Sequence, residues 1–493
     1  MSMRALEARK LLLRCRRSYS TSFPSLQESR PATAPRQYPP ITQIRENVEL
    51  YEKNTLVRNY RNHTDIPRRV AENALKIREL DQRMAGSRHT LKELQKQLNA
   101  SKGDKSDTVA RMKALRPEVD KLQAEKDVLE IDTQTMALSL PNLTSSETPT
   151  DGEPKLRSYI NYDPQNPPQY GRSADHSVIG EKLGLLDFSS AATTSGWGFY
   201  YLLNEAALLE QALVQYAMSV AMRRNWSVVS PPSLVYSHMA AACGFQPRDQ
   251  HDEQQIWQVA RSERDRGKPT RSLAATAEIP LAGMYANKAI PADRLPIKMV
   301  GPSRCYRAEA GARGVDTKGL YRVHEFTKVE MFAWTNSAAP SNQGLTDEAS
   351  WVEHAGRLLN EMVEIQTEIV SSLGLPCRIL EMPSSDLGAS AYRKIDIEAM
   401  FPSRKKRDEG WGEVTSASIC TDYQSRRLDT KVLEPDGSRK KFAHTVNGTA
   451  LAVPRVLAAI LENGWREDEG CVIIPEVLRR HMGGMEKIGP RLH

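Results

Sequence analysis

The chain has 493 residues, enough for two or three domains. Charged residues make up 26% of it and the formal net charge is +7, a balance that is compatible with a polyanionic partner without requiring one. Its six cysteines include no Cys-x-x-Cys pair, which argues against a cysteine zinc site and gives no sign of a disulfide framework. No apolar run approaches the ~20 residues that a membrane-spanning helix needs, so no membrane partner is expected.

The first 36 residues differ in composition from the rest of the chain. Six basic residues lie before position 18 and are followed by a Ser/Thr/Pro-rich stretch, whereas Glu7 and Glu28 are the only acidic residues. This composition is typical of a mitochondrial transit peptide, so we expect residues 1–36 to be a cleavable signal that targets the protein to the mitochondrial matrix. The alternative is an unstructured basic tail that contacts RNA.

Residues 37–145 are expected to form a helical arm. Apolar residues recur every seven positions over residues 70–98, and a second seam with 3-4 spacing runs over residues 112–140. The break between them, at residues 99–107, contains Gly and Asp and is typical of a turn. Two helices of similar length joined by a short turn predict an antiparallel coiled coil, with Pro117 kinking the second helix.

The outward face of this arm is rich in arginine and lysine, including Arg78, Lys92 and Lys96. On a coiled coil such a face is most often only solvated, so the charge by itself does not establish nucleic-acid binding. Residues 146–175 are an expected linker, because Pro, Asn, Gln and Tyr are abundant from residue 151 onward. Residues 176–493 are expected to form one further domain.

This last domain opens with residues 179–188, and a long amphipathic helix around residues 208–213 then leads to a strand at 226–229 and to Pro231-Pro232. An ordinary core helix and strand would give the same pattern. Thr276-Ala277-Glu278 then follows a short apolar run and is a weak signal when taken alone.

Residues 299–332 combine two strand-like runs with a glycine-containing loop at 310–319. Period-two alternation places Arg307 and Glu309 on one face of the first run. On the second run it aligns Arg322, His324, Phe326, Lys328 and Glu330 on one face, with Val323, Val329 and Met331 on the other. Because unpaired charge is costly to bury, the charged face predicts either a site for a polyanion with a flat base or an exposed, salt-bridged hairpin.

Two further motifs lie toward the end of the chain. Gly412–Ser416 follows a predicted strand and a basic loop. The oxygens of Glu413 and Ser416 would suit Mg²⁺ or Mn²⁺, but taken alone a glutamate such as Glu413 is more often a surface residue. A strand at residues 442–446 runs into Asn447-Gly448-Thr449, and the next helix carries Arg455. The chain has neither a Walker-type phosphate loop nor a Gly-x-Gly-x-x-Gly fingerprint.

The segments Tyr306-Arg307-Ala308-Glu309 and Arg322-Val323-His324-Glu325-Phe326, with the loop between them, together resemble motif 2 of a class II aminoacyl-tRNA synthetase. The chain from about residue 40 to about residue 488 resembles a seryl-tRNA synthetase of the bacterial and organellar type. Glu325 departs from the glutamine common in that family, but alternation points it away from the site, so we expect little consequence.

The resemblance implies an α+β fold in which the helical arm grips tRNA and residues 176–493 are a catalytic domain with a mainly antiparallel sheet. It also implies L-serine, ATP and tRNA(Ser) as substrates, Mg²⁺ as a cofactor, and a homodimer formed through the helix and strand at residues 208–229. ATP binding is thus inferred from the resemblance and not from a Walker or Rossmann motif.

The resemblance assigns roles to particular residues. Catalytic roles fall on Arg307 and Arg455. The serine-binding residues would be Thr276, Ala277, Glu278, Arg307, Glu330, Asn447 and Thr449. The ATP-binding residues would be Arg307, Ala308, Glu309, Arg322, Val323, Phe326, Glu413, Val414, Thr415, Ser416 and Arg455. Glu413 and Ser416 would also hold the metal, and Arg78, Lys92 and Lys96 would contact tRNA.

Three other classes of protein compete with this one. A related ligase that charges a carrier protein should lack the paired heptad segments. A tRNA-binding paralogue without activity should have lost motif residues, yet Arg307, Glu309 and Arg455 are present. A purely structural coiled-coil protein would not need the last three hundred residues.

Overall fold

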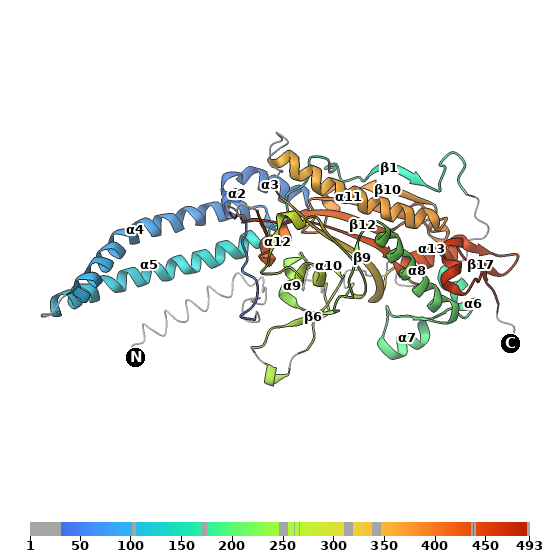
Figure 1. The fold of residues 1–493 in the computed structure, drawn as a ribbon, viewed down its shortest axis with the longest axis horizontal. Coiled ribbons are helices and arrows are strands. Elements are labelled where there is room, and N and C mark those ends of the chain that lie inside the picture. Colours follow the sequence, from blue (N-terminus) through green and yellow to red (C-terminus); the bar gives the residue numbers. More distant parts are fainter. Residues whose placement is uncertain are drawn as a thin grey trace.

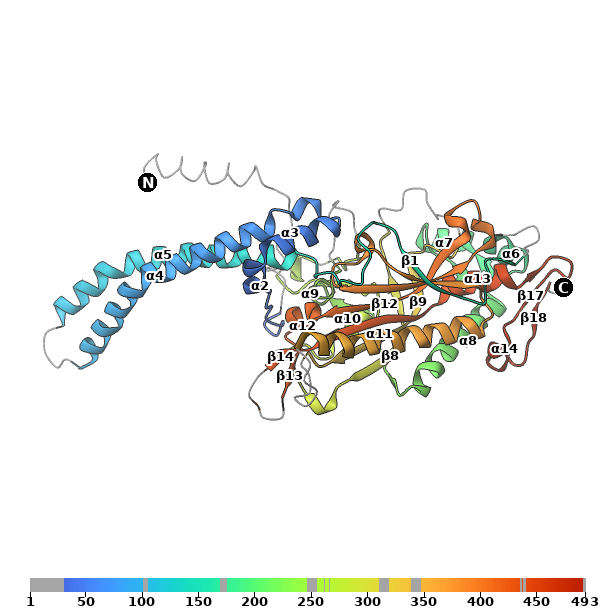
Figure 2. The same cartoon turned by 90° about the horizontal axis from the view of Figure 1, so that it is seen from above.

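A helical arm projects from one end of an α+β body (Figures 1 and 2). The computed structural model describes residues 31–100, 105–168, 175–245, 255–260, 262–265, 267–309, 319–337, 347–434, 437 and 440–490. Most of the expected transit peptide, the turn at residues 101–104 and the loop at residues 310–318 therefore lie outside the described residues.

The arm consists of two long helices on a base of shorter ones. The base contains α2 (Ile41–Glu46), α3 (Val48–Val57) and a 3₁₀ turn (Arg61–His63), and the long helices are α4 (Ile66–Ala100) and α5 (Ser106–Ser139). Helices α4 and α5 pack against each other in opposite directions, as the heptad pattern predicts. Pro117 lies inside α5, which continues through it.

The seam between α4 and α5 is mainly apolar, and in α5 it is interrupted by Lys126 and Thr133. Met84 and Leu122 are buried there, as the spacing predicts. Lys126 interrupts the seam, and its Nζ donates to both carboxylate oxygens of Asp81, at 2.8 and 2.9 Å. Thr133 is buried with its hydroxyl bonded to the carbonyl of Leu129, at 2.6 Å. Both polar interruptions therefore have hydrogen-bond partners.

The body is organised around an eight-stranded sheet in the order β1-β10-β11-β12-β15-β9-β8-β4. All neighbours pair antiparallel except β4 and β8, so the predicted antiparallel α+β core is confirmed. The strands are β1 (Lys155–Ile160), β4 (Ser227–Val228), β8 (Ile297–Tyr306), β9 (Glu325–Thr335), β10 (Cys377–Glu381), β11 (Arg393–Met400), β12 (Trp411–Thr421) and β15 (His444–Ala452).

Strand β1 corrects the expectation of a linker over residues 146–175. It pairs with β10 at the edge of the sheet, where only Ile160 is buried. Because the other side chains of β1 are exposed or half-buried, the strand has no apolar alternation for a sequence pattern to reveal.

Helices cover the two faces of the sheet unequally. On one face, α6 (His176–Lys182), α8 (Asn204–Arg223), α11 (Asp347–Ser372) and α13 (Val453–Gly464) pack on a large apolar core. On the other face, the short helices α9 (Ser237–Ala242), α10 (Glu278–Gly283) and α12 (Tyr423–Leu428) cover only the part of the sheet around Phe332 and Trp334. The rest of that second face remains open.

The remaining elements are short. They are α7 (Phe188–Ser195), α14 (Glu476–Arg479), β2 (Leu186–Asp187), β3 (Tyr201–Leu202), β5 (Leu234–Tyr236), β6 (Arg271–Leu273), β7 (Ala289–Pro291), β13 (Lys431–Leu433), β14 (Lys440–Phe442), β16 (Trp465–Arg466), β17 (Cys471–Ile473) and β18 (Lys487–Ile488). Among the described helices, none is both long and apolar enough to cross a membrane.

Candidate active site

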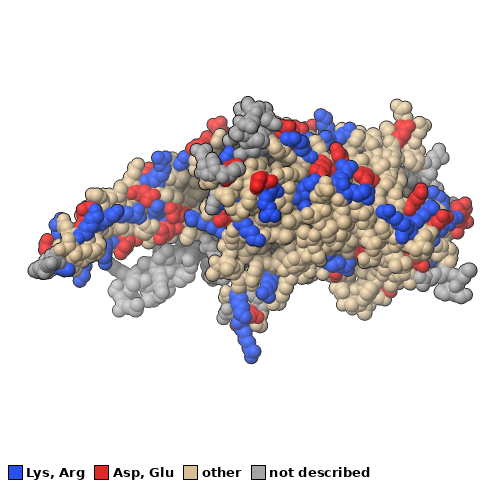
Figure 3. Space-filling view, viewed as in Figure 1, with Lys and Arg blue, Asp and Glu red and all other residues tan. Residues whose placement is uncertain are grey.

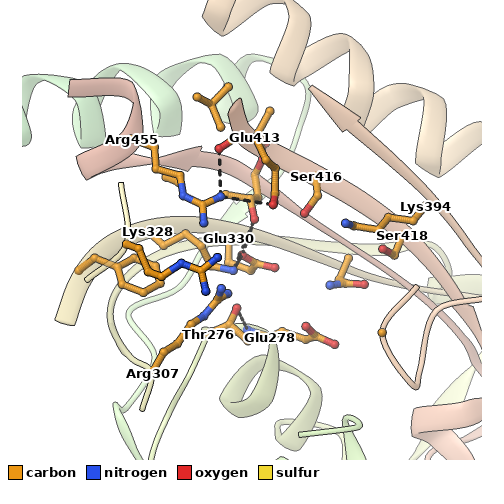
Figure 4. A pocket seen from close by; sticks show the side chains of 18 of the residues that line it. Thr276, Glu278, Arg307, Lys328, Glu330, Lys394, Glu413, Ser416, Ser418 and Arg455 are labelled. Atoms are coloured by element: carbon orange, nitrogen blue, oxygen red, sulfur yellow. Dashed lines mark hydrogen bonds and ion pairs between the residues drawn. The ribbon is translucent and has the colours of Figure 1, made fainter. Parts of the chain in front are cut away.

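A cavity of about 300 Å³ lies on the open face of the sheet. It gathers residues that are far apart in the chain (Figure 4). Of the predicted serine and ATP residues, those lining it are Thr276, Glu278, Arg307, Glu309, Arg322, Val323, Phe326, Glu330, Glu413, Val414, Thr415, Ser416, Asn447, Thr449 and Arg455. Ala277 and Ala308 do not line it; Ala277 is fully buried, and the backbone N–H of Ala308 donates to the carbonyl of Gln255.

The hairpin of β8 and β9 forms one wall, but its tip departs from the predicted alternation. The last paired residues are Tyr306 and Glu325, so residues 307–309 and 322–324 lie beyond the strands. Val323, predicted to point away, lines the cavity, whereas His324, predicted to point into it, does not. Strict alternation fails there because the residues beyond the last pair are not extended β-strand.

Arg307 is held by its backbone so that its side chain reaches the cavity. Its N–H donates to the carbonyl of His324 (2.9 Å), and its own carbonyl accepts from Nδ1 of His324 and Nε1 of Trp257, both at 3.0 Å. The guanidinium lies over the ring of Phe326, 5.3 Å from its centroid. His324 therefore positions Arg307 and does not line the cavity itself.

Glu309 and Arg322 pair across the hairpin tip. Oε2 of Glu309 lies 3.1 Å from Nη1 of Arg322, and Glu309 adopts a positive φ of 48°. A positive φ is uncommon for a residue with a side chain, and such conformations cluster at functional sites. The turn in the backbone directs Glu309 toward the cavity.

Three buried polar side chains meet at the centre of the site. Nζ of Lys328 lies 2.6 Å from Oε2 of Glu330, and the hydroxyl of Thr449 lies 3.4 Å from each group. Glu330 and Thr449 are direct partners in the pairing of β9 with β15. The register of the sheet therefore brings together two residues that are 119 positions apart.

Glu278 lies nearby at the start of α10 and is 4% exposed. Its carboxylate accepts from Nε2 of Gln424 at 2.5 Å. Burial, together with the negative charge of Glu330, raises the pKa of Glu278 to about 8. A cation placed beside this carboxyl group would favour its ionised form.

A β-bulge brings Glu413 and Ser416 to the same cavity. Thr415 pairs with Ile397 and Glu413 pairs with Glu398, so Val414 is an extra residue in β12. In a regular strand, residues three apart point to opposite faces, and the bulge removes that conflict. Both side chains point into the cavity in Figure 4.

Arg455 extends from α13 toward Glu413. Its Nη1 lies 3.3 Å from Oε2 of Glu413, and its Nε donates to the carbonyl of Tyr321 at 3.1 Å. Burial alone would raise the pKa of Glu413, but the positive charges of Arg455 and Lys394 outweigh it and lower the pKa to about 2. The carboxylate is therefore ionised at neutral pH.

Several cavity residues were not predicted from the sequence. They are Phe245, Tyr321, Lys328, Asp386, Gly388, Ser390, Ala391, Lys394, Ser418, Ala452 and Pro454. Alternation places Lys328 on the correct face, but the sequence assigns no role to it. The segment at residues 386–391 carries no motif, so nothing in the sequence alone indicates it.

Asp175, His176 and Glu462 are the one described group of acidic and histidine side chains close enough to share a metal ion. Nδ1 of His176 donates to Glu462 (2.7 Å), and Nε2 accepts from the backbone N–H of Leu320 (2.9 Å). Both ring nitrogens thus have protein partners, which favours a structural role.

Comparisons with known proteins agree with this geometry. The family model described as the tRNA synthetase class II core domain (G, H, P, S and T) matches residues 261–464. The mitochondrial serine–tRNA ligase of Saccharomyces cerevisiae is 38% identical over 445 residues, which cover 90% of this chain and 92% of that protein. The mitochondrial serine–tRNA ligase of Schizosaccharomyces pombe is 36% identical over 473 residues, covering 94% and 91%.

A solved structure is similar over almost the same length. The seryl-tRNA synthetase of Pyrococcus horikoshii, complexed with ATP, matches with a TM-score of 0.78 at 28% identity and covers 92% of this chain and 99% of that one. With sequence, fold and cavity in agreement, the chain belongs to the serine–tRNA ligases, ATP-dependent enzymes of the class II aminoacyl-tRNA synthetases.

Proposed function

We propose that this chain activates L-serine with ATP to form seryl-adenylate and transfers the seryl group to the 3′ end of tRNA(Ser) in mitochondria. The observation that carries the proposal is the single cavity in which Arg307, Glu330, Glu413 and Arg455 meet. It combines groups for a polyanion, a flat base and an ammonium ion, which are the parts of the two small substrates.

Adenylate formation is an in-line attack by the serine carboxylate on the α-phosphate of ATP. The protein has to position two anions and stabilise the charge that develops between them. Arg307 is suited to bridge the α-phosphate and the carboxylate, because its planar fork binds either group with two hydrogen bonds. Phe326 would stack on the adenine, Glu309 would accept from its amino group, and Arg322 would face the base.

Glu413, Ser416 and Arg455 would take the outer phosphates. The carboxylate of Glu413 is 39% exposed toward the cavity, ionised, and beside the hydroxyl of Ser416. This donor set of hard oxygens fits Mg²⁺, which would neutralise phosphate charge when bound. Arg455 already lies against Glu413 and would extend to the phosphates from the same side.

The serine end of the cavity would be formed by Glu278, Glu330 and Thr449, with Thr276 and Asn447 beside them. The carboxylates suit the ammonium group, and Thr449 suits the side-chain hydroxyl. A pocket that hydrogen-bonds a hydroxyl rejects analogues lacking it, because its own buried polar groups are then left unpaired. Selection of serine over alanine would follow from this arrangement.

The arm would bind tRNA through its basic outer face. Arg78, Lys92 and Lys96 are exposed on α4, and Figure 3 shows lysine and arginine side chains along the visible face of the arm, interspersed with acidic ones. Lys96 already pairs with Glu93 at 2.8 Å, so its contact with a phosphate would compete with that pair. The proposed boundaries are residues 37–145 for the arm and 176–493 for the catalytic domain.

A homodimer would form through the helix and strand at residues 208–229, which are α8 and β4. Large apolar side chains are exposed on these elements, namely Leu208, Met222 and Val228. Large apolar side chains exposed together often mark a protein interface. Sedimentation should then give twice the mass of one chain.

The mitochondrial location rests on the composition of residues 1–36 and on the mitochondrial relatives. We expect a fusion of this segment to a fluorescent reporter to accumulate in the mitochondrial matrix. Fluorescence throughout the cytosol would contradict the assignment.

Replacing the Arg307 side chain should remove the charge that stabilises the reacting phosphate. We expect Arg307→Ala to lower serine-dependent ATP–pyrophosphate exchange by at least ~10²-fold, the scale for losing one preorganised donor. Arg304→Ala is the matched control, because Arg304 lies near the end of β8, shortly before Arg307, but pairs with Glu325 and lies outside the cavity. Wild-type exchange in a folded Arg307→Ala protein would refute this role.

Serine binding should release a proton from the site. At pH 7 the Glu278 carboxyl group, with its pKa of about 8, is mostly protonated, and Glu330, Lys328 and Arg307 are the charged groups around it. An ammonium group bound beside it would favour the carboxylate, so up to about one proton should leave per serine bound. Calorimetry at pH 7 in buffers of different ionisation enthalpy measures this number. Binding without proton release would place the ammonium elsewhere.

Activation and charging should separate when the outer arm is removed. If residues 76–134 are replaced by a short flexible linker, serine-dependent exchange should survive, because no cavity residue is removed. Aminoacylation should fall sharply, since the basic face is removed with the arm. Full-rate charging by the armless protein would show that the arm is only structural.

The salt dependence of tRNA binding distinguishes charge from packing. Substituting Arg78 or Lys92 by Met should weaken binding and reduce the log–log salt slope by up to about one unit for each phosphate that the variant no longer neutralises. Lys126→Met is the control, because Lys126 lies in the seam against Asp81. A weaker affinity with an unchanged slope would indicate a packing defect.

A further inference from the structure

The base of the arm grips an irregular segment of the body, residues 387–391. This segment lies between the 3₁₀ turn Ser384–Asp386 and strand β11 and belongs to neither. All five of its backbone carbonyl oxygens accept hydrogen bonds from two residues of the arm, Arg58 and Asn142. Two residues from one domain thus hold a continuous stretch of backbone in the other.

Arg58 supplies three of these bonds. It follows α3 and is 1% exposed. Its Nη2 donates to the carbonyls of Gly388 (2.6 Å) and Leu387 (3.3 Å). Its Nη1 donates to Ala391 and to Asn142, both at 2.9 Å. Burial lowers the pKa of Arg58 to about 10, so the guanidinium still carries its charge at neutral pH.

Asn142 supplies the other two. Its backbone N–H donates to the carbonyl of Ala389 at 2.8 Å, and its Nδ2 donates to Ser390 at 2.9 Å. The same Nδ2 donates to the carbonyl of Cys420 in β12, also at 2.9 Å. Asn142 therefore ties the segment both to the arm and to the central sheet.

The same segment forms a wall of the active-site cavity. Gly388, Ser390 and Ala391 line it, next to Lys394 and Ser418. In Figure 4, Lys394 and Ser418 lie at the end of the cavity away from Arg455. Ser418 also pairs directly with Asn447 across β12 and β15, which places this wall beside the proposed serine end.

We propose that Arg58 and Asn142 are positioning residues for the serine end of the active site, and that the base of the arm is therefore a structural part of the catalytic cavity. The hydrogen bonds of Arg58 and Asn142 to residues 387–391 are called the clamp below. The identity of the substrate at this wall rests on the proposed function, whereas the clamp does not. Without Arg58, three carbonyls lose a donor and the segment gains conformational freedom. Serine binding then has to supply the free energy of ordering the wall.

The effect should be on serine binding more than on the chemical step. Arg307 and Arg455 are held by the hairpin and by α13, which Arg58 does not contact. In Arg58→Met we expect the KM for serine in pyrophosphate exchange to rise about tenfold or more, while kcat and the KM for ATP stay within about threefold; tenfold corresponds to about 1.4 kcal/mol. Arg58→Lys, which keeps the charge and some donors, should recover part of the loss.

Arg427→Met is the matched control. Arg427 is also a buried arginine that joins the arm to the body, because its Nη2 donates to the carbonyl of Leu138 at 3.0 Å. Its Nη1 donates to the carbonyl of Tyr423, and the side chain neither lines the cavity nor bonds to the 387–391 segment. Arg427→Met should keep the KM for serine near the wild-type value even if it lowers the melting temperature.

A second measurement tests the clamp without any substrate. Hydrogen exchange of a peptide covering residues 384–394 should be faster in Arg58→Met than in wild type and Arg427→Met. If Arg58→Met does not fold, Asn142→Asp replaces it, since this variant keeps the side-chain volume and loses the Nδ2 donor.

The outcomes separate this inference from the proposed function. Faster exchange with a raised KM for serine supports the inference. An unchanged KM for serine, or an equal rise in the Arg58 and Arg427 variants, overturns it. If wild-type protein shows no serine-dependent exchange of pyrophosphate, the proposed function fails, and unchanged hydrogen exchange in the variants would separately overturn the clamp.

Discussion

The register of strand β9 between β8 and β15 is the constraint on which the active site depends. Glu330 lies opposite Gly301 in β8 and opposite Thr449 in β15. In the same strand, Val329 and Met331 are fully buried on the helix-covered face. A slip of one residue would exchange the two faces, placing Glu330 in the apolar core and Val329 in the cavity. The apolar core thus fixes the position of the charged residues that line the cavity.

The open face of the sheet carries buried charged side chains that are not needed to stabilise the fold. Lys328 and Glu330 are 6% and 1% exposed, and they pair at 2.6 Å. Buried ion pairs are often no more stable than apolar residues of similar volume, because desolvation offsets their attraction. Glu278, whose pKa is raised, is a third buried ionisable side chain in the same cavity. Such a concentration is characteristic of a binding site for charged substrates.

Much of the fold and most of the candidate site were predictable from the sequence. The exceptions lie where no repeating local geometry leaves a pattern in the sequence. The heptads predict α4 and α5, and the two strand-like runs predict the β8–β9 hairpin, because each pattern reports a repeating local geometry. The orientations that alternation predicted for Val323 and His324 were wrong, because these residues lie where the strand geometry has ended; the resemblance, in contrast, had placed Val323 among the residues of the site. Strand β1 was not predicted because it is an edge strand with little burial.

Other features depend on contacts that no local pattern encodes. The bulge at Val414 decides that Glu413 and Ser416 share a face, and it is visible only in the pairing of β12 with β11. The resemblance named both residues without explaining how a strand presents them together. The wall at residues 387–391 was not predicted for a similar reason, since its conformation is held by residues more than two hundred positions away.

The outer end of the arm and its base, which joins the body, have separate packing clusters. Its outer packing cluster contains Leu80, Met84 and Leu122, whereas the cluster at its base is built around Ile44, Val70 and Met136, and the two share no residue. The ion pair of Lys126 with Asp81 lies within the outer cluster, since Leu122 and Leu129 flank Lys126 along α5 and Asp81 lies between Leu80 and Met84 in α4. A charged pair at a partly exposed position contributes little to stability, so the outer cluster depends mainly on its few apolar side chains.

The outer arm and the base of the arm therefore have separate apolar clusters. The base is fixed by Arg58 and Asn142, which hold the wall of the cavity through hydrogen bonds that are buried or partly buried. A tRNA bound along the outer arm would contact helices that pack around the outer cluster, whereas the base of the arm is hydrogen-bonded to a wall of the cavity. Because the two ends pack separately, one element could present a surface to a large polyanion and also shape a cavity for a small amino acid.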